Sequence, residues 1–203
     1  MKNRIVRGLL ATAIALLAIP AASADASLVE VSACDDAPLS KPFQRWADAA
    51  DYKLAPGGDL EAGTAGWALS GGAGTVAGGE PWNVTGQTGR RALSLPAGAS
   101  ATTPATCVNA GAPTFRFFAR STAGLLPLLK VDLVYRDGAL GLLSVPAGIV
   151  TPTSSWQPSL AMLTHAAVGG ALAGGEAPLS LRFTAVTGTW QVDDVFVDPY
   201  ARR

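Results

Sequence analysis

From about residue 56 onward, apolar and polar residues alternate with the period of two that is typical of β-strands. The runs are short and rich in Val, Leu, Thr and aromatic residues, and Gly, Pro, Asn or Asp interrupts them roughly every 8 to 12 residues. This pattern predicts an all-β fold, a sandwich of two antiparallel sheets. We expect strands over residues 58–61, 67–70, 74–77, 92–95, 101–107, 114–120, 129–135, 140–146, 157–164, 179–184 and 189–197.

The clearest alternation occurs over residues 114–120 and 129–135, where each expected strand has one polar face. The dipeptide Asp137-Gly138 follows the second of these strands, and such a pair favours a tight hairpin because the turn needs positive φ. We therefore expect the strands on either side of it to be antiparallel neighbours. The apolar faces of the two strands consist of Phe115, Phe117, Ala119, Val131, Leu133 and Tyr135.

The first residues have the features of an export signal. Three basic residues precede an apolar run over 8–22, and the sequence Ala-Ser-Ala at 22–24 offers small residues for cleavage. The run is shorter than the roughly 20 residues that a membrane-spanning helix needs, and no later segment approaches that length. We predict a signal peptide over residues 1–24 and a secreted, extracellular protein without a membrane span. An uncleaved N-terminal anchor is the alternative.

Residues 25–52 lack regular alternation and are expected to form an arm outside the sandwich domain, which we assign to residues 53–203. Ser40 is suited to an N-cap, and Pro42 fits a first helical turn, so a short helix is expected within the arm. Phe43 and Trp46 are three residues apart and would share one helical face. We expect both rings to dock against the sandwich.

Charge adds a constraint on partners. Lys and Arg together number 15, as do Asp and Glu, so the chain has no net charge. Nucleic acids and anionic membranes are therefore poor candidate partners. We expect a monomer.

The chain has two cysteines, Cys34 and Cys107, both beyond the expected cleavage site. In an oxidising exterior they are expected to form one disulfide, which would link the arm to the sandwich. A metal pair or a reactive thiol remains the alternative.

Two short motifs resemble the galactose-binding-like jelly rolls, a superfamily that includes carbohydrate-binding modules. The first is PGGDLE at 56–61 with GWALSGG at 66–72, which is similar to the opening strands, and the second is QVDDVFV at 191–197, which is similar to the last strand. From about residue 51 onward the chain is also similar to uncharacterised secreted proteins of high-GC Gram-positive bacteria. The resemblance implies a jelly-roll β-sandwich whose first and last strands pair. It implies no particular activity.

In many members of that superfamily, carboxylates from the opening and the last strands hold a structural Ca²⁺, a hard cation that needs several oxygen ligands. The resemblance implies that Glu61 and either Asp193 or Asp194 would play this part. Two consecutive residues of a strand point to opposite faces, so at most one of the aspartates is expected to join Glu61. The alternative is a surface carboxylate pair, or an Asp that closes a turn.

Five tryptophans exceed what a core of this size demands. Trp67 and Trp190 lie within the motifs of the resemblance and are expected to pack in the core. Trp82 and Trp156 have polar or Pro neighbours, and a solvent-facing ring there would stack on the apolar face of a sugar while nearby polar groups bind its hydroxyls. Packing of both rings remains the alternative. The predicted glycan-binding residues are Trp82, Asn83, Trp156, Gln157 and Arg136.

An enzyme is not expected, because the chain has a single histidine, His165, and no nucleophile-turn motif. The sequence thus favours a secreted, noncatalytic binding module, with a glycan of the cell envelope or the environment as its ligand. The second hypothesis is a structural or adhesion protein of the cell exterior without a small ligand.

Overall fold

The computed structural model describes residues 38–86, 89–109, 114–137, 140–164 and 176–198. These residues form β-strands and one short 3₁₀ turn, so the all-β prediction is confirmed. No helix in these segments is long and apolar enough to cross a membrane. The elements are β1 (Leu39–Ser40), η1 (Gln44–Trp46), β2 (Tyr52–Leu54), β3 (Ala68–Ser70), β4 (Gly74–Ala77), β5 (Arg91–Leu95), β6 (Ser100–Thr102), β7 (Thr106–Asn109), β8 (Thr114–Asp137), β9 (Gly141–Val150), β10 (Gln157–Pro158), β11 (Met162–Leu163) and β12 (Glu176–Val197).

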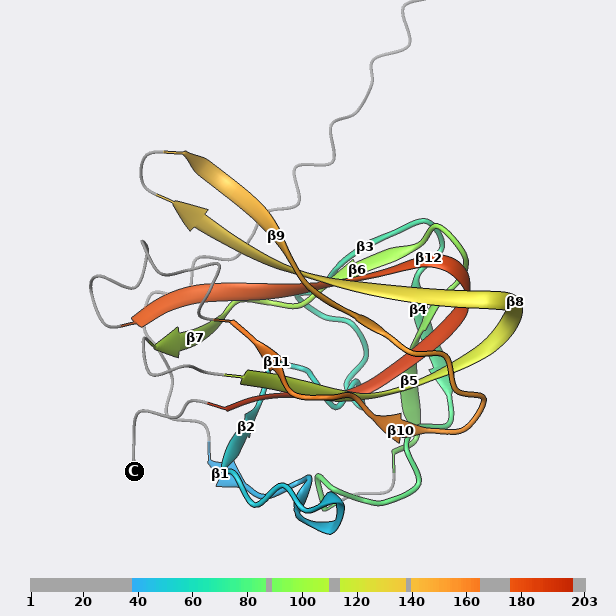
Figure 1. Cartoon of the computed structure of the whole chain (residues 1–203), viewed down its shortest axis with the longest axis horizontal. Coiled ribbons are helices and arrows are strands. Elements are labelled where there is room, and N and C mark those ends of the chain that lie inside the picture. Colours follow the sequence, from blue (N-terminus) through green and yellow to red (C-terminus); the bar gives the residue numbers. More distant parts are fainter. Residues whose placement is uncertain (1–37, 87–88, 110–113, 138–139, 165–175, 199–203) are drawn as a thin grey trace, which may run out of the picture.

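Two long antiparallel strands, β8 and β12, organise the sandwich because each contributes one half to each layer (Figure 1). The first layer joins residues 129–137 of β8 and 176–185 of β12, with β9 beside β8 and with β6, β7 and β3 on the β12 side. The second layer joins residues 114–121 of β8 and 189–197 of β12, with β10, β11, β5, β4, β2 and β1. The layers are therefore connected in one hydrogen-bonded sheet.

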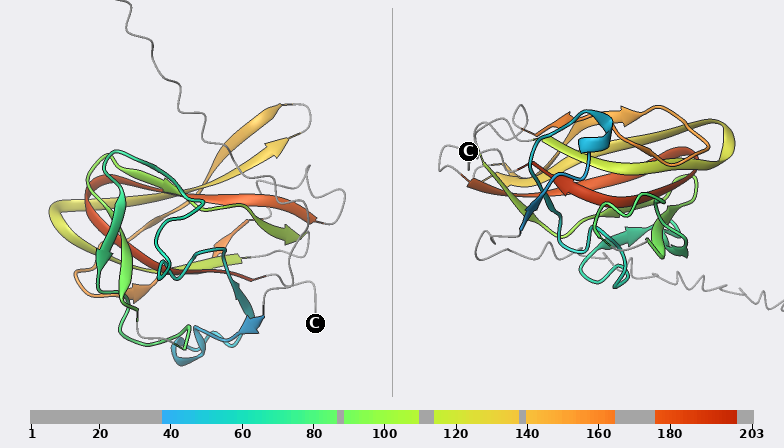
Figure 2. Two further views of the ribbon diagram at one scale, coloured as in Figure 1. Left: turned by 180° about the vertical axis from the view of Figure 1, so that it is seen from behind. Right: turned by 90° about the horizontal axis from the view of Figure 1, so that it is seen from below.

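The two long strands bend side by side where they pass from one layer to the other (Figures 1 and 2). Gly124 and Gly188 lie at this bend with φ of 115° and 71°, in the region that favours glycine. A Cβ on Gly188 would lie 2.6 Å from the carbonyl oxygen of Ala123. Two glycines are thus required for the backbones to approach here.

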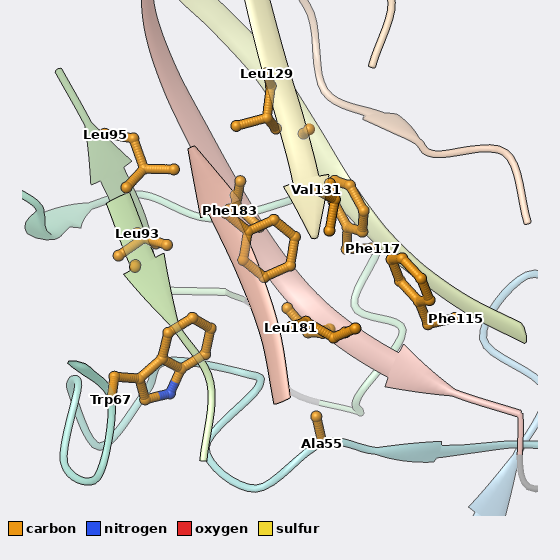
Figure 3. Close-up of a cluster of buried hydrophobic side chains, with 14 of the residues drawn as sticks. Ala55, Trp67, Leu93, Leu95, Phe115, Phe117, Leu129, Val131, Leu181 and Phe183 are labelled. Carbon is orange, nitrogen blue, oxygen red and sulfur yellow. The ribbon is translucent and has the colours of Figure 1, made fainter. Parts of the chain in front are cut away.

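The main core lies between the layers, and Figure 3 shows several of its side chains converging from both. The rings of Phe117 and Phe183 meet edge to face with centroids 4.9 Å apart, one from each layer. The predicted apolar faces are confirmed, because Phe115, Phe117, Ala119, Val131, Leu133 and Tyr135 all belong to this core. Trp67 and Trp190 also pack in it, as expected.

Several of the expected strands differ from those of the structure. Residues 58–61 form turns rather than a strand, and Leu60 has a φ of 56°, which an extended strand does not accommodate. The strand expected over 101–107 is divided into β6 and β7, and Pro104 lies in the break, consistent with its lack of an N–H donor. The strand expected over 157–164 is likewise divided, into β10 and β11. The strands expected over 114–120 and 129–135 are confirmed, but they are continuous in β8, and those expected over 179–184 and 189–197 are continuous in β12.

The expected pairing of a first strand at 58–61 with the last strand was wrong, because a different element occupies the place beside β12. The strand β2, which the alternation did not predict, pairs with β12. Next to it, the N–H of Ala55 donates to the carbonyl oxygen of Val195, and the N–H of Val195 donates to that of Gly58. The predicted hairpin is present, because Asp137 of β8 lies opposite Gly141 of β9.

The described part of the arm lies against the outer face of the second layer. In place of the expected short helix, this part of the arm has a single 3₁₀ turn, η1. Phe43 is fully buried and Trp46 packs beside it, so the predicted docking of both rings is confirmed. The predicted signal peptide lies outside the described residues, as does His165.

Candidate functional site

A second apolar cluster covers part of the outer face of the second layer, and we call it the outer aromatic cluster. The ring of Phe118, which projects outward from β8, lies at its centre, because Phe43, Trp46 and Trp82 all lie with ring centroids 5.3–5.4 Å from it. Aromatic residues therefore come together from the arm, from β8 and from the loop after β4. The buried members are Phe43, Tyr52, Ala92, Phe118, Trp156 and Phe196, with Trp46 and Trp82 at the border.

Trp46 and Trp82 form the part of this cluster that solvent reaches. Both side chains are half-buried, and their rings meet edge to face at 5.0 Å and 85°. The guanidinium of Arg45 lies 5.3 Å from the centre of the Trp46 ring, and Asn83 beside Trp82 is exposed. An apolar edge bordered by hydrogen-bonding groups suits a ligand that has both C–H faces and hydroxyls.

A row of polar side chains runs across the strands next to this cluster, and we call it the polar strip. It consists of Arg120 on β8, Gln191 on β12 and Ser94 on β5, which lie directly opposite one another in register. All three are half-buried, while their strand neighbours Ala119 and Val192 face the core. Because side chains alternate along a strand, Arg120 shares the outer face with Phe118 at the centre of the cluster. The polar strip thus adjoins the aromatic surface.

The loop that carries Trp82 is anchored by a buried carboxylate. Glu80 accepts hydrogen bonds from the N–H groups of Trp82 and of Val84, the latter at 3.1 Å. The N–H of Glu80 in turn donates to Oδ2 of Asp193 on β12 at 2.8 Å. This chain of contacts connects the position of the Trp82 backbone to the sheet.

Asp193 and Asp194 form a buried acidic group with Glu80. The strand has a bulge after Asp193, and Asp194 has a φ of 46°, so strict alternation is lost and both side chains are buried. Burial raises the pKa of Asp193 to about 7, and the charges of Glu80 and Glu61 act in the same direction, against two backbone hydrogen bonds. Burial and the neighbouring Asp193 and Glu80 raise the pKa of Asp194 as well. The strict alternation on which the prediction of opposite faces rested is therefore absent at this position.

The predicted calcium ligand Glu61 lies in a turn rather than on a strand. Its Oε1 accepts hydrogen bonds from the N–H groups of Arg90 and Arg91 at 2.6 and 3.1 Å, and its Oε2 pairs with Nε of Arg90 at 3.2 Å. Both carboxylate oxygens of Asp193 likewise accept backbone N–H groups. Among the described residues, no group of three or more His, Cys, Asp or Glu is arranged to hold a metal ion. The present positions of these side chains do not fit a calcium cage, and calcium binding stays an untested prediction.

The structure brings together some of the predicted ligand residues and separates others. Trp82 and Trp156 belong to the same outer aromatic cluster, but Trp156 is only 7% exposed. Its ring supports the guanidinium of Arg120, which lies 4.9 Å from the ring centre. Gln157 is exposed on β10 next to Trp156, whereas Arg136 is exposed on the part of β8 that belongs to the first layer. Arg136 therefore does not share a face with the tryptophans.

The arm is held in place by a buried ion pair beneath the cluster. Nη1 of Arg116 lies 2.7 Å from Oδ2 of Asp48, which also accepts a hydrogen bond from the Tyr52 hydroxyl at 2.8 Å. Partial burial acts to raise the pKa of Asp48, but the hydrogen bonds from Arg116 and Tyr52 outweigh it and lower that pKa. The Arg116 guanidinium also stacks on Phe43 at 4.3 Å. These contacts fix the segment that presents Trp46.

Cys107 on β7 is buried and is disulfide-bonded. Its predicted partner, Cys34, lies outside the described residues, so the pairing of the two stays a prediction.

Two hollows occur elsewhere on the described surface. One of about 340 Å³ lies between the end of β9 and the segment 157–162, and Ile149, Leu160 and Met162 line it. The other, of about 480 Å³, is lined by Glu61, Arg90, Arg91 and β4. Trp82 and Arg120 line neither of these two hollows.

Sequence reasoning missed several residues of this surface. Trp46 was expected to dock against the sandwich but was not assigned to the ligand surface. Arg120, Gln191 and Ser94 gave no signal because their row forms only when distant strands pair. The sequence does show that these polar residues alternate with the apolar residues Ala119, Val192 and Leu93. It does not show the order in which the strands pair.

No protein-family model matches the chain, and no curated protein matches it. Solved structures do. The family 22 carbohydrate-binding module at the C-terminus of Clostridium thermocellum Xyn10B is 15% identical over 69% of this chain and 89% of that chain, with a TM-score of 0.46. TmCBM61, in complex with β-1,4-galactotriose, is 14% identical over 71% of this chain and 96% of that chain, with a TM-score of 0.43.

A third match is the CBM22-1–GH10 portion of the Clostridium thermocellum endo-1,4-β-D-xylanase 10B, in complex with xylohexaose. It is 13% identical over 70% of this chain, with a TM-score of 0.45, and the match spans 27% of the xylanase chain. These three structures contain carbohydrate-binding modules, the class that the sequence motifs resemble. With identities below 25% and TM-scores below 0.5, they assign neither a family nor a ligand to this chain.

Proposed function

We propose that this protein is a noncatalytic glycan-binding module that binds its ligand on the outer face of the second layer. The observation that carries the proposal is the pair of half-exposed rings, Trp46 and Trp82, beside the polar strip. The C–H face of a sugar ring would cover Trp82, and the strip offers a guanidinium, an amide and a hydroxyl to the sugar hydroxyls. A row of half-buried aromatic and polar side chains across several strands suits an extended polysaccharide.

We further propose the setting in which this module works. The expected signal peptide and disulfide support a location outside the cell. We expect the protein to act there as a monomer, with a glycan of the envelope or the environment as its partner. The calcium ion implied by the sequence resemblance would be structural and would take no part in binding.

Pull-down with insoluble polysaccharides and a glycan array, followed by titration calorimetry, tests the proposal. We expect Trp82→Ala to weaken binding at least about tenfold, which corresponds to about 1.4 kcal/mol. Trp67→Phe is the matched control, because it changes a tryptophan of the internal core and should leave the affinity of the folded protein unchanged.

If the folded wild-type protein binds no glycan, the proposal is wrong. The structural or adhesion hypothesis would then be favoured, in which the outer aromatic cluster serves only to hold the arm. Unchanged binding by a folded Trp82→Ala variant would instead place the binding surface elsewhere.

A further inference from the structure

Arg116 and Arg120 lie four residues apart on the same outer face of β8, and their guanidinium groups have different partners. Nε and Nη2 of Arg116 donate to the carbonyl oxygen of Ser159 at 2.9 and 2.7 Å, and Nη1 pairs with Asp48. The Arg116 side chain is 9% exposed. Its guanidinium is therefore fully occupied in holding the arm.

The guanidinium of Arg120 is fixed but not neutralised. Its Nε donates to Oε1 of Gln191 at 2.8 Å, and its plane lies over the ring of Trp156. Those two contacts restrict its orientation, since stacking and a hydrogen bond act on different sides of the group. Within the described part of the chain, no carboxylate lies within ion-pair distance of Arg120 and no acceptor contacts its two Nη groups.

The acidic residue that lies closest along the same face of β12 is Asp193, two positions from Gln191. Asp193 is fully buried, and both of its oxygens accept backbone N–H groups of Glu80 and Asp194. It is thus committed to the loop anchor. The half-exposed Arg120 keeps its positive charge and two outward N–H donor groups at the border of the aromatic surface.

We infer that Arg120 binds the carboxylate of an acidic sugar, so that the site selects polysaccharides containing uronic acids. The inference rests on the proposed function. A guanidinium held in one orientation forms paired hydrogen bonds with a planar carboxylate, and a charged acceptor strengthens them. A uronic acid carries that carboxylate on the same ring whose C–H face would stack on Trp82. The polymer would lie across the strip with its carboxylate over β8.

Matched pairs of ligands that differ only in the carboxyl group test this inference. The probes are polygalacturonate, alginate, hyaluronan and glucuronoxylan, each beside its carboxyl-reduced form, titrated calorimetrically at low and moderate salt. We expect at least one acidic polymer to bind about tenfold or more tightly than its reduced form, and the preference to shrink as salt screens the charge.

Arg120→Gln should abolish that preference, because it lowers the affinity for the acidic polymer far more than the affinity for the reduced polymer, to which the guanidinium can donate only hydrogen bonds without a charged acceptor. Arg120→Lys should restore only part of it, because an ammonium keeps the charge without the planar pair of donors. Arg182→Gln is the matched control, since Arg182 is also half-buried and donates from Nε, to Thr102 on the first layer. Melting curves of all variants establish that each is folded.

The outcomes separate the inference from the proposed function. Equal binding of acidic and reduced polymers, lost in both cases in Trp82→Ala, would overturn the inference and support glycan binding. Binding only to neutral glycans would do the same, and binding to no glycan would overturn both. If dextran sulfate displaces the bound acidic polymer as effectively as free acidic polymer does, the site binds anions in general. That result would also overturn selection for a carboxylate.

Discussion

At the scale of single residues, the buried carboxylates next to the Trp82 loop account for most of the unusual electrostatics. Glu80, Asp193 and Asp194 are all nearly inaccessible to solvent, and no basic side chain pairs with them among the described residues. Negative charges so close together in a low-dielectric site repel, which favours the protonated form. A proton or a cation must therefore offset this charge when the protein folds.

This arrangement predicts how stability changes with pH in the presence of a chelator. Asp193 has a pKa of about 7 in the folded protein against 3.8 when unfolded, and the pKa of Asp194 is raised too. The folded state thus keeps protons that the unfolded state releases, and the free energy of unfolding should fall as pH rises from about 4 to about 7. Asp194→Asn should reduce this fall. Urea denaturation at several pH values measures both.

Two other carboxyl groups act in the opposite sense and in a lower pH window. The pKa values of Asp48 and Glu61 are lowered in the folded protein, so their contribution is present above about pH 4 and is lost as pH falls below it. If the structural calcium ion binds, it requires ionised carboxylates and should raise the melting temperature at pH 7 to 8 but not near pH 4.5. A stability that rises steadily from pH 4 to 7 in chelator would contradict the account.

At the scale of elements, the bend shared by β8 and β12 is the feature on which the sandwich depends. Gly188→Ala would place a Cβ 2.6 Å from the carbonyl oxygen of Ala123 and also 2.6 Å from Cβ of Pro127, at a φ of 71°. Positive φ alone costs about 1–3 kcal/mol for a non-glycine residue, and the contacts add to it.

Gly63→Ala is the matched control for that variant. Its φ is 90°, and nothing lies within 4 Å of the added Cβ, so it carries the backbone cost without the collision. We expect Gly188→Ala to lower the free energy of unfolding clearly more than Gly63→Ala, by urea denaturation. Equal losses would show that the bend tolerates a side chain.

The bend also shows where sequence reasoning stops. Alternation located both halves of β8 correctly, since the apolar period restarts at Leu129, but nothing local indicates that the strand continues through Gly124. The bulge after Asp193 cannot be predicted from the local sequence either, because it depends on the register between β12 and β8. Local pattern therefore predicts which side chains are buried, whereas continuity and strand order depend on tertiary contacts.

At the scale of the whole molecule, the two outer faces of the sandwich have different properties. The second layer carries the arm, the outer aromatic cluster and the polar strip, and the first layer carries Arg136 and the ion pair between Lys130 and Asp132. Sequence reasoning predicted Trp82 and Trp156 together with Arg136, although these lie on opposite layers. These residues are distant in the sequence and were assigned to one site only because their side chains suit a sugar ligand. Their positions on different layers become evident only in the fold.

The central claim is that a glycan binds the outer face of the second layer, and amide hydrogen exchange with and without a bound polysaccharide tests it most directly. We predict added protection in the Trp82 loop, in residues 118–122 of β8 and around Gln191, with none in residues 130–136 on the first layer. Protection confined to residues 130–136, with the Trp82 loop unchanged, would contradict the account.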